Sequence, residues 1–563
     1  MITRRRAPLL AGALVVVVAL VAGIVTLLGV APWQPDSSAG AGPVPQFVED
    51  TAVSGLAFTY DGPFPYAVGG GVAVFDCNDD GFEDLYIAGG DGRAALFRNA
   101  STSGGELRFE RVPSATTDLT AVNGAYPIDI DGDGQVDLVT LRNGENVVLR
   151  GLGNCRFERA NDAWDLDGGG QQTEAFSATW EGGATWPTLA FGNYADPGSH
   201  DPATWCETNE LVRPRLRTSL SPGFGAPTPL EPSFCALSML FSDWDGSGRM
   251  DLRISNDEHY YDQRLGGEQL WRIDPAGGAP RLYTADEGWA LVQIQGMGIA
   301  SQDLTGDGLP EVYLTSQAAS RLQTLESGPS RPAYRDIGAL RGVNVAQPYA
   351  GDDLHLPSTA WHPEFADVNN DGLLDLFVSK GNVTTQPDYA IQDPSNLLLG
   401  QPDGTFREAA EAAGIMEFDR GRGAALADFN LDGSLDLVEV SYGAPVRLWR
   451  NAGPGTGTAA SSARWLALRV GQPGPNADAI GAVVEVRSGQ HVERRELTIG
   501  GGHAGGQLGW LHFGVGSAVA AQIRVTWPDG AATDWQEVSS NAFYVLDRGG
   551  APLLWAPIGG GAE

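Results

Sequence analysis

Asp129-Ile-Asp-Gly-Asp-Gly-Gln-Val-Asp137 is an acidic nonapeptide with an apolar run on each side, and modified copies of it recur along the chain. Glycine at position 6 permits a tight turn that brings the ninth side chain back toward the first. Oxygen-bearing side chains at positions 1, 3, 5 and 9 then converge, so each copy is a predicted ligand set. The six sets are Asp76, Asn78, Asp80 and Asp84; Asp129, Asp131, Asp133 and Asp137; Asp243, Asp245, Ser247 and Asp251; Asp303, Thr305, Asp307 and Glu311; Asp367, Asn369, Asp371 and Asp375; and Asp428, Asn430, Asp432 and Asp436.

These ligand sets predict bound calcium (Ca2+). Carboxylates packed into one loop without a cation repel each other by about 4 kcal/mol per pair at ~4 Å and an effective dielectric constant of roughly 20. A hard divalent cation removes that repulsion, and an all-oxygen set suits calcium better than zinc or copper. For a single copy, an Asx-rich turn without metal is the alternative, but six copies favour calcium. Ser247, Thr305 and Glu311 depart from the pattern, so we expect weaker binding in those two copies.

The residues around each loop predict a β-hairpin rather than an EF-hand. An EF-hand needs flanking helices and a glutamate at position 12. The first five copies have no glutamate there, and short apolar runs such as residues 71–75 and 85–88 flank the loop. Each loop is therefore expected at the tip of a hairpin.

The spacing of the copies predicts seven repeat units. Successive first aspartates lie 53, 114, 60, 64 and 61 residues apart. The second interval is about twice the others, and residues 189–195 supply a strand in its middle without the acidic loop. A second apolar hairpin follows most copies, which makes four strands per unit. The expected fold class is all-β, a seven-bladed β-propeller at residues 47–462 followed by a small all-β domain.

One segment predicts that the propeller is closed. Residues 47–56 (Phe-Val-Glu-Asp-Thr-Ala-Val-Ser-Gly-Leu) parallel residues 406–415 (Phe-Arg-Glu-Ala-Ala-Glu-Ala-Ala-Gly-Ile) almost position by position. The last unit lacks this strand after residue 451. Residues 47–56 should complete the last blade from the other end of the chain, which leaves no open edge between first and last blade.

The N-terminus predicts export. Three arginines at residues 4–6 precede an apolar stretch without a charge until Asp36. A helix of ~20 such residues crosses a bilayer with its basic flank inside, so residues 1–32 are expected to form a signal anchor or transmembrane helix, with a linker at 33–46. The bulk of the chain would then be extracytoplasmic, in the periplasm or on the cell surface, and anchored to the cell membrane. The alternative is secretion after signal cleavage near residue 31.

Charge and cysteine content fit that compartment. The formal net charge is −34, and Lys380 is the only lysine, which argues against nucleic acid as a partner and against adsorption to anionic lipid. The four cysteines allow three pairings. In an oxidising compartment we expect two disulfides, with Cys206–Cys235 closing a proline-rich insertion and Cys77–Cys155 as the remaining pair.

The C-terminal part differs in texture. After the Gly/Thr/Ala/Ser-rich residues 453–463, strand-like runs alternate with turns, which predicts an all-β domain at residues 463–548 and a tail at 549–563. Gly500, Gly502 and Gly505 fit the spacing of a dinucleotide-binding loop. The following residues are strand-like, so a glycine-rich β-turn is the better interpretation.

The motifs resemble known families. The acidic repeats resemble FG-GAP/VCBS repeats, similar to those of integrin α-subunit propellers. Residues 476–482, 500–503, 511–516 and 525–530 resemble the ASPIC/UnbV domain. The combination is similar to bacterial relatives of the cartilage acidic protein family. This resemblance implies an extracellular protein with calcium-dependent binding or adhesion, and it names no ligand.

No catalytic constellation is found in the sequence. It contains no HExxH, Walker or GxSxG motif, so no catalytic residue is assigned and an enzyme is not expected. The expected function is an extracytoplasmic binding, adhesion or scaffold module for protein or glycan. The alternative is an exported enzyme of unknown chemistry, for example a carbohydrate-active one, with its site in the propeller channel or in the insertion at residues 197–235.

Overall fold

The described part of the chain is built almost entirely of β-strands. The computed structural model describes residues 42–196, 205–215, 222–258, 266–344, 356–454 and 463–557. The helical segments in these ranges are short: α2 (Thr51–Ser54), α4 (Gly338–Arg341), α5 (Ala410–Ala413), and the 3-10 turns η1 (Phe64–Val68), η3 (Ala285–Glu287) and η4 (Gly328–Ser330). The all-β class predicted from the sequence is confirmed.

Seven antiparallel sheets follow one another along the chain. The first three consist of β2 (Val72–Phe75), β3 (Asp84–Ile87), β5 (Ala95–Asn99) and β6 (Phe109–Arg111); β7 (Thr120–Ile128), β8 (Asp137–Arg142), β9 (Val147–Gly151) and β10 (Phe157–Arg159); and β11 (Thr173–Thr179), β12 (Thr188–Asn193), β13 (Asn209–Val212) and β14 (Thr228–Leu230). The next three consist of β15 (Ala236–Ser242), β16 (Asp251–Asn256), β17 (Gln269–Arg272) and β18 (Arg281–Leu282); β19 (Gln295–Gln302), β20 (Glu311–Gln317), β21 (Arg321–Leu325) and β22 (Tyr334–Asp336); and β23 (Ala360–Ala366), β24 (Asp375–Lys380), β25 (Asn396–Gly400) and β26 (Phe406–Glu408). The seventh consists of β27 (Gly421–Ala427), β28 (Asp436–Ser441), β29 (Arg447–Pro454) and β1 (Pro45–Glu49), and β4 (Gly90–Arg93) adds a fifth strand to the second sheet beside β7.

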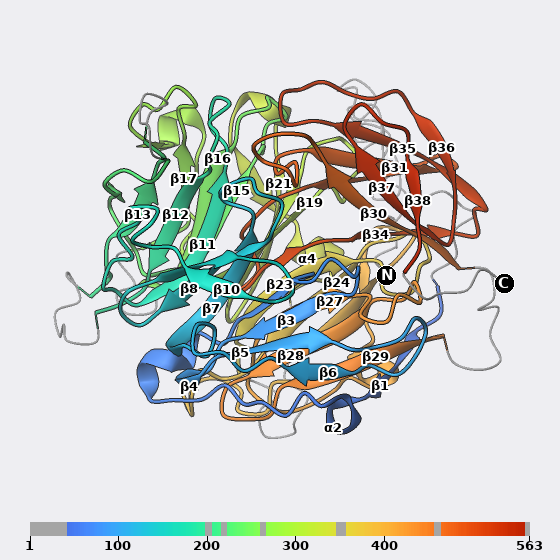
Figure 1. Ribbon diagram of the computed structural model, residues 1–563, viewed down its shortest axis with the longest axis horizontal. Coiled ribbons are helices and arrows are strands. Elements are labelled where there is room, and N and C mark those ends of the chain that lie inside the picture. The colour runs from blue at the N-terminus through green and yellow to red at the C-terminus, as the bar shows by residue number, and fades with distance from the viewer. Residues whose placement is uncertain are drawn as a thin grey trace, which may run out of the picture.

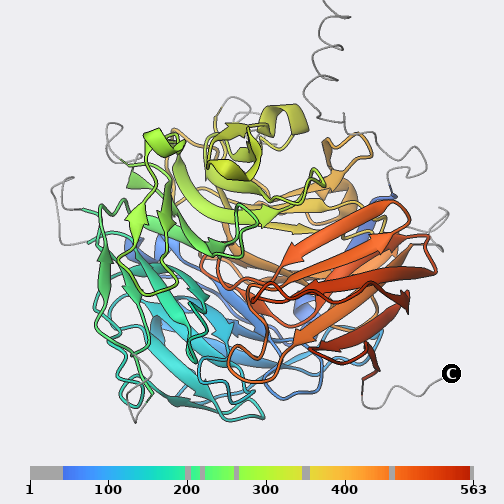
Figure 2. The same ribbon diagram turned by 90° about the horizontal axis from the view of Figure 1, so that it is seen from above.

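The first strands of the sheets form a closed circle. Each of β2, β7, β11, β15, β19, β23 and β27 contacts the corresponding strand of the next sheet, and β27 contacts β2 (Figures 1 and 2). Residues on these strands are mostly buried on both faces. Apolar side chains of neighbouring sheets pack against each other, as Phe377, Leu426 and Trp449 do between the last two sheets. The core is therefore a ring of intersheet layers.

The ring closes as the sequence predicts. β1 pairs antiparallel with β29, placing Phe47 opposite Asn451 and Glu49 opposite Trp449. Phe47 is buried within the cluster that includes Trp449, while the neighbouring Val48 is 43% exposed. The first described strand thus completes the last sheet, and the helix α2 that follows it corresponds to α5 after β26.

The acidic loops lie at the tips of the inner hairpins. In the first sheet, Phe75 pairs with Asp84 across the loop, and in all six copies the ninth residue begins the second strand. The third sheet is the exception: residues 180–187 join β11 and β12 there without the acidic pattern, and residues 189–195 overlap β12. This sheet corresponds to the degenerate repeat expected from the doubled interval.

Two disulfides fasten the ring. Cys77–Cys155 links the first acidic loop to the second sheet, and Cys206–Cys235 closes the insertion in the third sheet. Both pairings agree with the prediction, and the described residues contain no free cysteine.

The C-terminal domain consists of two further four-stranded sheets. One has the order β34 (Leu511–Gly516), β30 (Arg464–Gly471), β37 (Ala542–Asp547), β38 (Leu553–Trp555). The other has the order β32 (His491–Glu496), β31 (Val483–Ser488), β35 (Ala520–Thr526), β36 (Gln536–Ser539). β38 lies beyond residue 548, so part of the stretch expected to be a tail pairs with β37. The short strand β33 (Gln507–Leu508) lies between β32 and β34 in sequence, but it pairs with neither of these two sheets. It pairs in parallel with β2 of the ring.

The N-terminal segment expected to form a membrane anchor, residues 1–32, lies outside the described residues. Within the described ranges, none of the helices has the length and apolar character that crossing a membrane requires.

Candidate metal centres

The six acidic loops share one backbone conformation. We number them in chain order: loop 1 (76–84), loop 2 (129–137), loop 3 (243–251), loop 4 (303–311), loop 5 (367–375) and loop 6 (428–436). Positions 4 and 6 adopt left-handed φ values, 60° at Asp79 and 86° at Gly81 in loop 1. In each loop the glycine N–H at position 6 donates to the carboxylate at position 1, at 2.7 to 3.0 Å. This bond turns the loop back on its first residue, as the spacing predicts.

The position-9 carboxylate is anchored in the sheet in loops 1, 2, 5 and 6. Asp84, for example, accepts hydrogen bonds from the backbone N–H groups of Cys77 and Asn99 at 2.8 and 2.7 Å. The equivalent pairs reach Asp137, Asp375 and Asp436. Each carboxylate oxygen retains lone-pair capacity after one such bond. The anchoring fixes where the ninth residue presents its oxygens to the loop.

The donor sets fit a hard cation. In loops 1 and 6, Oδ1 of Asn78 and of Asn430 is buried and has no hydrogen-bond partner among the described residues, although burying a lone carbonyl oxygen is unfavourable. In loop 2, carboxylate oxygens of Asp129, Asp131 and Asp137 lie within 4.8 Å of one another. Converging oxygens that keep free lone pairs are what calcium coordination requires.

Burial makes the loop carboxylates hard to ionise without a cation. Burial, with the charge of Asp432 as a smaller cause, raises the pKa of Asp428 to about 8. Burial raises the pKa of Asp129 to about 6. The pKa values of Asp84, Asp137, Asp367, Asp375 and Asp436 also lie well above their usual range, chiefly because of burial.

These shifts predict opposite pH responses with and without calcium. A carboxyl whose pKa is raised by folding binds its proton more tightly in the folded state, so stability falls as the pH rises toward that pKa. In calcium-depleted buffer the melting temperature should therefore be higher near pH 6 than near pH 8, given the pKa of about 8 at Asp428. In saturating calcium protons compete with the cation, and the order should reverse. Parallel pH profiles in the two buffers would contradict the assignment.

Loop 4 keeps its carboxylates together, with no arginine bonded to its position-9 carboxylate in the described part of the chain. Oε2 of Glu311 accepts the N–H groups of Leu304 and Thr305 at 2.9 and 3.1 Å. Its Oε1 accepts the hydroxyl groups of Thr305 and Thr324 at 3.3 and 2.7 Å, which leaves less capacity for a cation than in loops 1, 2, 5 and 6. Burial raises the pKa of Glu311 to about 7. The Gly308 N–H donates to Asp303 and the Leu309 N–H to Asp307, both at 2.9 Å, as the equivalent amides do in loops 1, 2, 5 and 6.

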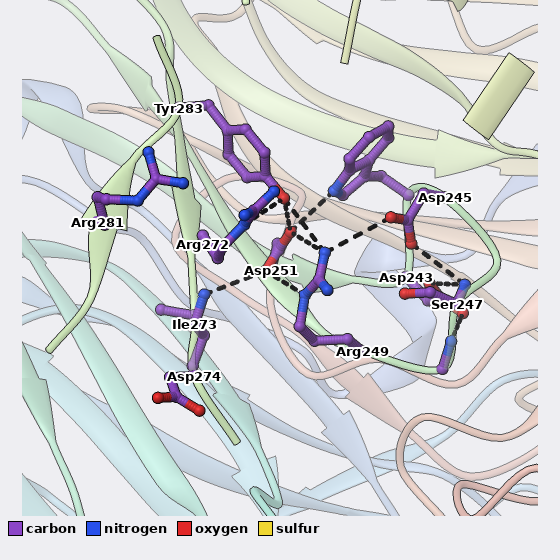
Figure 3. A network of polar contacts seen from close by, with 12 residues as sticks. Asp243, Asp245, Ser247, Arg249, Asp251, Arg272, Ile273, Asp274, Arg281 and Tyr283 are labelled. Atoms are coloured by element: carbon purple, nitrogen blue, oxygen red, sulfur yellow. Dashed lines mark hydrogen bonds and ion pairs between the residues drawn. The ribbon is translucent and has the colours of Figure 1, made fainter. Parts of the chain in front are cut away.

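Loop 3 does not fit a cation. Both oxygens of Asp251 are taken by hydrogen-bond donors, among them the Trp244 indole at 2.9 Å and the Tyr283 hydroxyl at 2.7 Å. The Arg249 guanidinium forms an ion pair with the same carboxylate at 3.2 Å (Figure 3). Asp243, Asp245, Ser247 and Asp251 therefore lie together as predicted, but their environment is unlike that of the other five loops.

The C-terminal domain packs on the ring of acidic loops. Trp510 donates from its indole N–H to the Gly81 carbonyl of loop 1 at 3.1 Å. The Glu496 carboxylate accepts the N–H of Asp243 in loop 3 at 2.8 Å. Nε2 of His512 lies 2.6 Å from Oδ1 of Asn370 in loop 5. The loops thus support an interdomain interface as well as the hairpins.

A glycine-rich segment of that domain enters the centre of the ring. Residues 499–508 form single bridges or short pairings with the inner strands of five sheets: Ile499 with Ala178, Gly500 with Leu240, Gly502 with Ile299, Gly505 with Ala125, and β33 with β2. A Cβ on Gly505 would lie 2.2 Å from the Val72 carbonyl oxygen, so only glycine permits this approach. A cavity of about 210 Å³ remains beside the segment, lined in part by His362, Glu364 and Glu496.

Family comparisons agree with the class of protein that this fold defines. Residues 76–140 match the model described as an FG-GAP-like repeat, and residues 472–553 match the model described as ASPIC and UnbV. The chain therefore carries an FG-GAP-like repeat and an ASPIC/UnbV domain, as the motifs indicated.

Among individual proteins, the chain is similar to cartilage acidic protein 1. It is 27% identical over 260 residues to the proteins of Mus musculus and Homo sapiens, covering 45% of this chain and 36% of each relative. The chain thus spans about a third of the length of these relatives. The Xenopus tropicalis protein is 42% identical over 57 residues, covering 10% of this chain and 9% of the relative.

Two solved structures show a weak likeness. One is a lectin of Agrocybe aegerita that recognises non-reducing terminal N-acetylglucosamine, at 16% identity, 66% of this chain, 88% of that chain and a TM-score of 0.37. The other is a mutant of AofleA from Arthrobotrys oligospora, at 14% identity, 61% of this chain, 86% of that chain and a TM-score of 0.33. Both scores are low, and the ring is defined by the pairing and contacts of its own strands.

Proposed function

We propose that this protein is an exported, calcium-binding, seven-bladed β-propeller that acts as an extracytoplasmic binding or scaffold module. The observation that carries the proposal is the convergence of oxygens in the acidic loops, including the unpaired amide oxygens of Asn78 and Asn430. The two disulfides support an oxidising compartment. Attachment to the membrane through residues 1–32, or secretion after cleavage there, belongs to the same proposal.

Calcium would supply charge neutralisation and cross-linking in this protein. Loops 1, 2, 4, 5 and 6 would hold it through their side-chain oxygens at positions 1, 3, 5 and 9. The residue at position 9 is the first residue of the second strand. A cation would therefore link the beginning of each loop to its end, where the second strand of the hairpin starts. Because the C-terminal domain packs on the same loops, the bound calcium ions would also stabilise the interdomain interface.

The end of the ring opposite the acidic loops is the proposed binding face. The acidic loops follow the inner strands and are covered by the C-terminal domain, so the connections that precede the inner strands lie at the other end. Phe64 and Phe418 lie on two such connections, before the adjacent strands β2 and β27, and are 47% and 42% exposed. Exposed aromatic rings are common anchors for protein and sugar ligands.

A glycan array and a pulldown, run with calcium and with chelator, test this function. We expect saturable binding without turnover. Replacing Phe64 and Phe418 with alanine should weaken binding by about 10-fold or more, as for interface anchors. Leu340→Ala is the matched control and should leave binding unchanged, because Leu340 is an exposed apolar residue on helix α4, after the outer strand β22 of the fifth sheet. Turnover of a glycoside substrate that stops on chelation would instead support an exported enzyme.

A further inference from the structure

Position 7 distinguishes loop 3 from the other acidic loops. It is Phe82, Gln135, Leu309, Leu373 or Ser434 in loops 1, 2, 4, 5 and 6, and its backbone N–H donates there to the position-5 aspartate at 2.8 to 2.9 Å. In loop 3 position 5 is Ser247, which has no carboxylate to accept this bond, and position 7 is Arg249. A lost ligand and a gained cation therefore occur in the same loop.

The Arg249 side chain turns into the loop. Its Nε and Nη2 lie 3.2 and 3.3 Å from the two oxygens of Asp251 at position 9. Its Nη2 also lies 3.5 Å from Asp245 at position 3. Figure 3 shows the guanidinium between the carboxylates of Asp251 and Asp245, with the Tyr283 hydroxyl beside Asp251. The cationic group thus joins the two parts of the loop that calcium would join elsewhere.

The remaining contacts of Asp251 reinforce this arrangement. In loops 1, 2, 5 and 6 the position-9 carboxylate accepts the backbone N–H of position 2, whereas Asp251 accepts the side-chain N–H of Trp244 at position 2 and the hydroxyl of Tyr283. Arg249 also donates to that hydroxyl at 3.2 Å. The donors to Asp251 therefore occupy both of the oxygens that a cation at position 9 would need.

Loop 2 shows that a nearby arginine does not by itself exclude a metal. Arg150 pairs with Asp131 and Asp133 at 2.8 Å from the neighbouring strand β9. It leaves Asp137 to its two backbone donors, and the oxygens of Asp129, Asp131 and Asp137 still converge. Arg249 differs because it occupies the position-9 carboxylate itself.

The geometry points to Arg249 as a built-in replacement for calcium, which keeps loop 3 closed without metal. This inference rests on the calcium sites proposed above. Five of the six loops bind a calcium ion from solution, and loop 3 uses the guanidinium of Arg249 instead. Loop 3 supports the contact between Asp243 and Glu496 of the C-terminal domain, so one part of the interdomain interface would persist when calcium is removed.

Hydrogen exchange of the full-length protein tests this inference. The amides of Ser247 and Gly248 report closure of loop 3 through their bonds to Asp243, and the amides of Asp432 and Gly433 report loop 6 in the same way. On chelation we expect exchange in loop 6 to accelerate at least about 10-fold, and exchange in loop 3 to change less than about twofold. Arg249→Met should open loop 3 in chelator, with a similar 10-fold acceleration. Arg281→Met is the matched control, because Arg281 lies on β18 of the same sheet and pairs with Glu287 rather than with the loop.

The possible results are separable. If loop 3 accelerates on chelation as much as loop 6, or if Arg249→Met leaves loop 3 as protected as Arg281→Met does, the inference is wrong. If no loop responds to chelation, the proposed calcium function fails, and the Arg249→Met arm still decides whether the arginine closes loop 3.

Discussion

Chelation of calcium is expected to lower the melting temperature of this protein by more than about 10 °C. A cation that binds only the folded state at 100-fold saturation stabilises it by about 2.7 kcal/mol per site, and several sites add. Five of the acidic loops bring oxygens together where a calcium ion would bind. Burial raises carboxyl pKa values in these loops, as at Asp428. Differential scanning calorimetry in calcium and in chelator measures the shift.

Magnesium is the control for that experiment. It prefers a small octahedral shell and keeps its waters, so it should restore only a small part of the loss at equal concentration. A melting temperature that is the same in calcium and in chelator would refute the proposal that the loops bind calcium and thereby stabilise the fold.

Replacing Phe47 with aspartate is expected to destabilise the whole ring, because β1 is the strand that closes it. Phe47 is buried among side chains of the last two sheets, and losing a buried phenylalanine costs about 3–5 kcal/mol before the charge is counted. Urea denaturation measures the change.

Val48→Asp is the matched control, one residue along the same strand. Its side chain is 43% exposed on the other face of β1, and such surface substitutions usually change stability by less than about 0.5 kcal/mol. Equal effects of the two substitutions would mean that β1 does not hold the ring together.

Much of the ring was predictable because its signals are local and repeated. Hairpin tips need only a nine-residue pattern, and the missing strand after residue 451 is recognisable at residues 47–56 because the two segments align by position. The pairing of Cys206 with Cys235 also follows from sequence proximity. Each of these inferences depends on spacing along the chain.

The placement of the C-terminal domain could not be predicted in this way. Its contacts with the acidic loops join residues far apart in sequence, as between Trp510 and Gly81. The sequence predicts a glycine-rich β-turn at Gly500 and Gly505, whereas in the structure this segment lies against the inner strands of the ring. The available signal was the glycines that face it: a Cβ on Gly71 or Gly124 would collide with the Ala504 carbonyl.

The sequence indicates only part of what distinguishes loop 3 from the other acidic loops. Ser247 indicates a weaker site, but the pattern assigns no ligand to position 7, so it gives Arg249 no role. Only the side-chain geometry shows that its guanidinium reaches Asp251. A cation inside an acidic repeat is the sequence feature that could have identified it.

Anomalous diffraction from crystals of the protein grown in saturating calcium tests directly whether the loops bind metal. A calcium peak is expected among the ligand oxygens of loops 1, 2, 4, 5 and 6, and the guanidinium of Arg249 in place of a peak in loop 3. Loops 1 and 6 without a cation under these conditions, with Asn78 and Asn430 bonded elsewhere, would contradict this expectation.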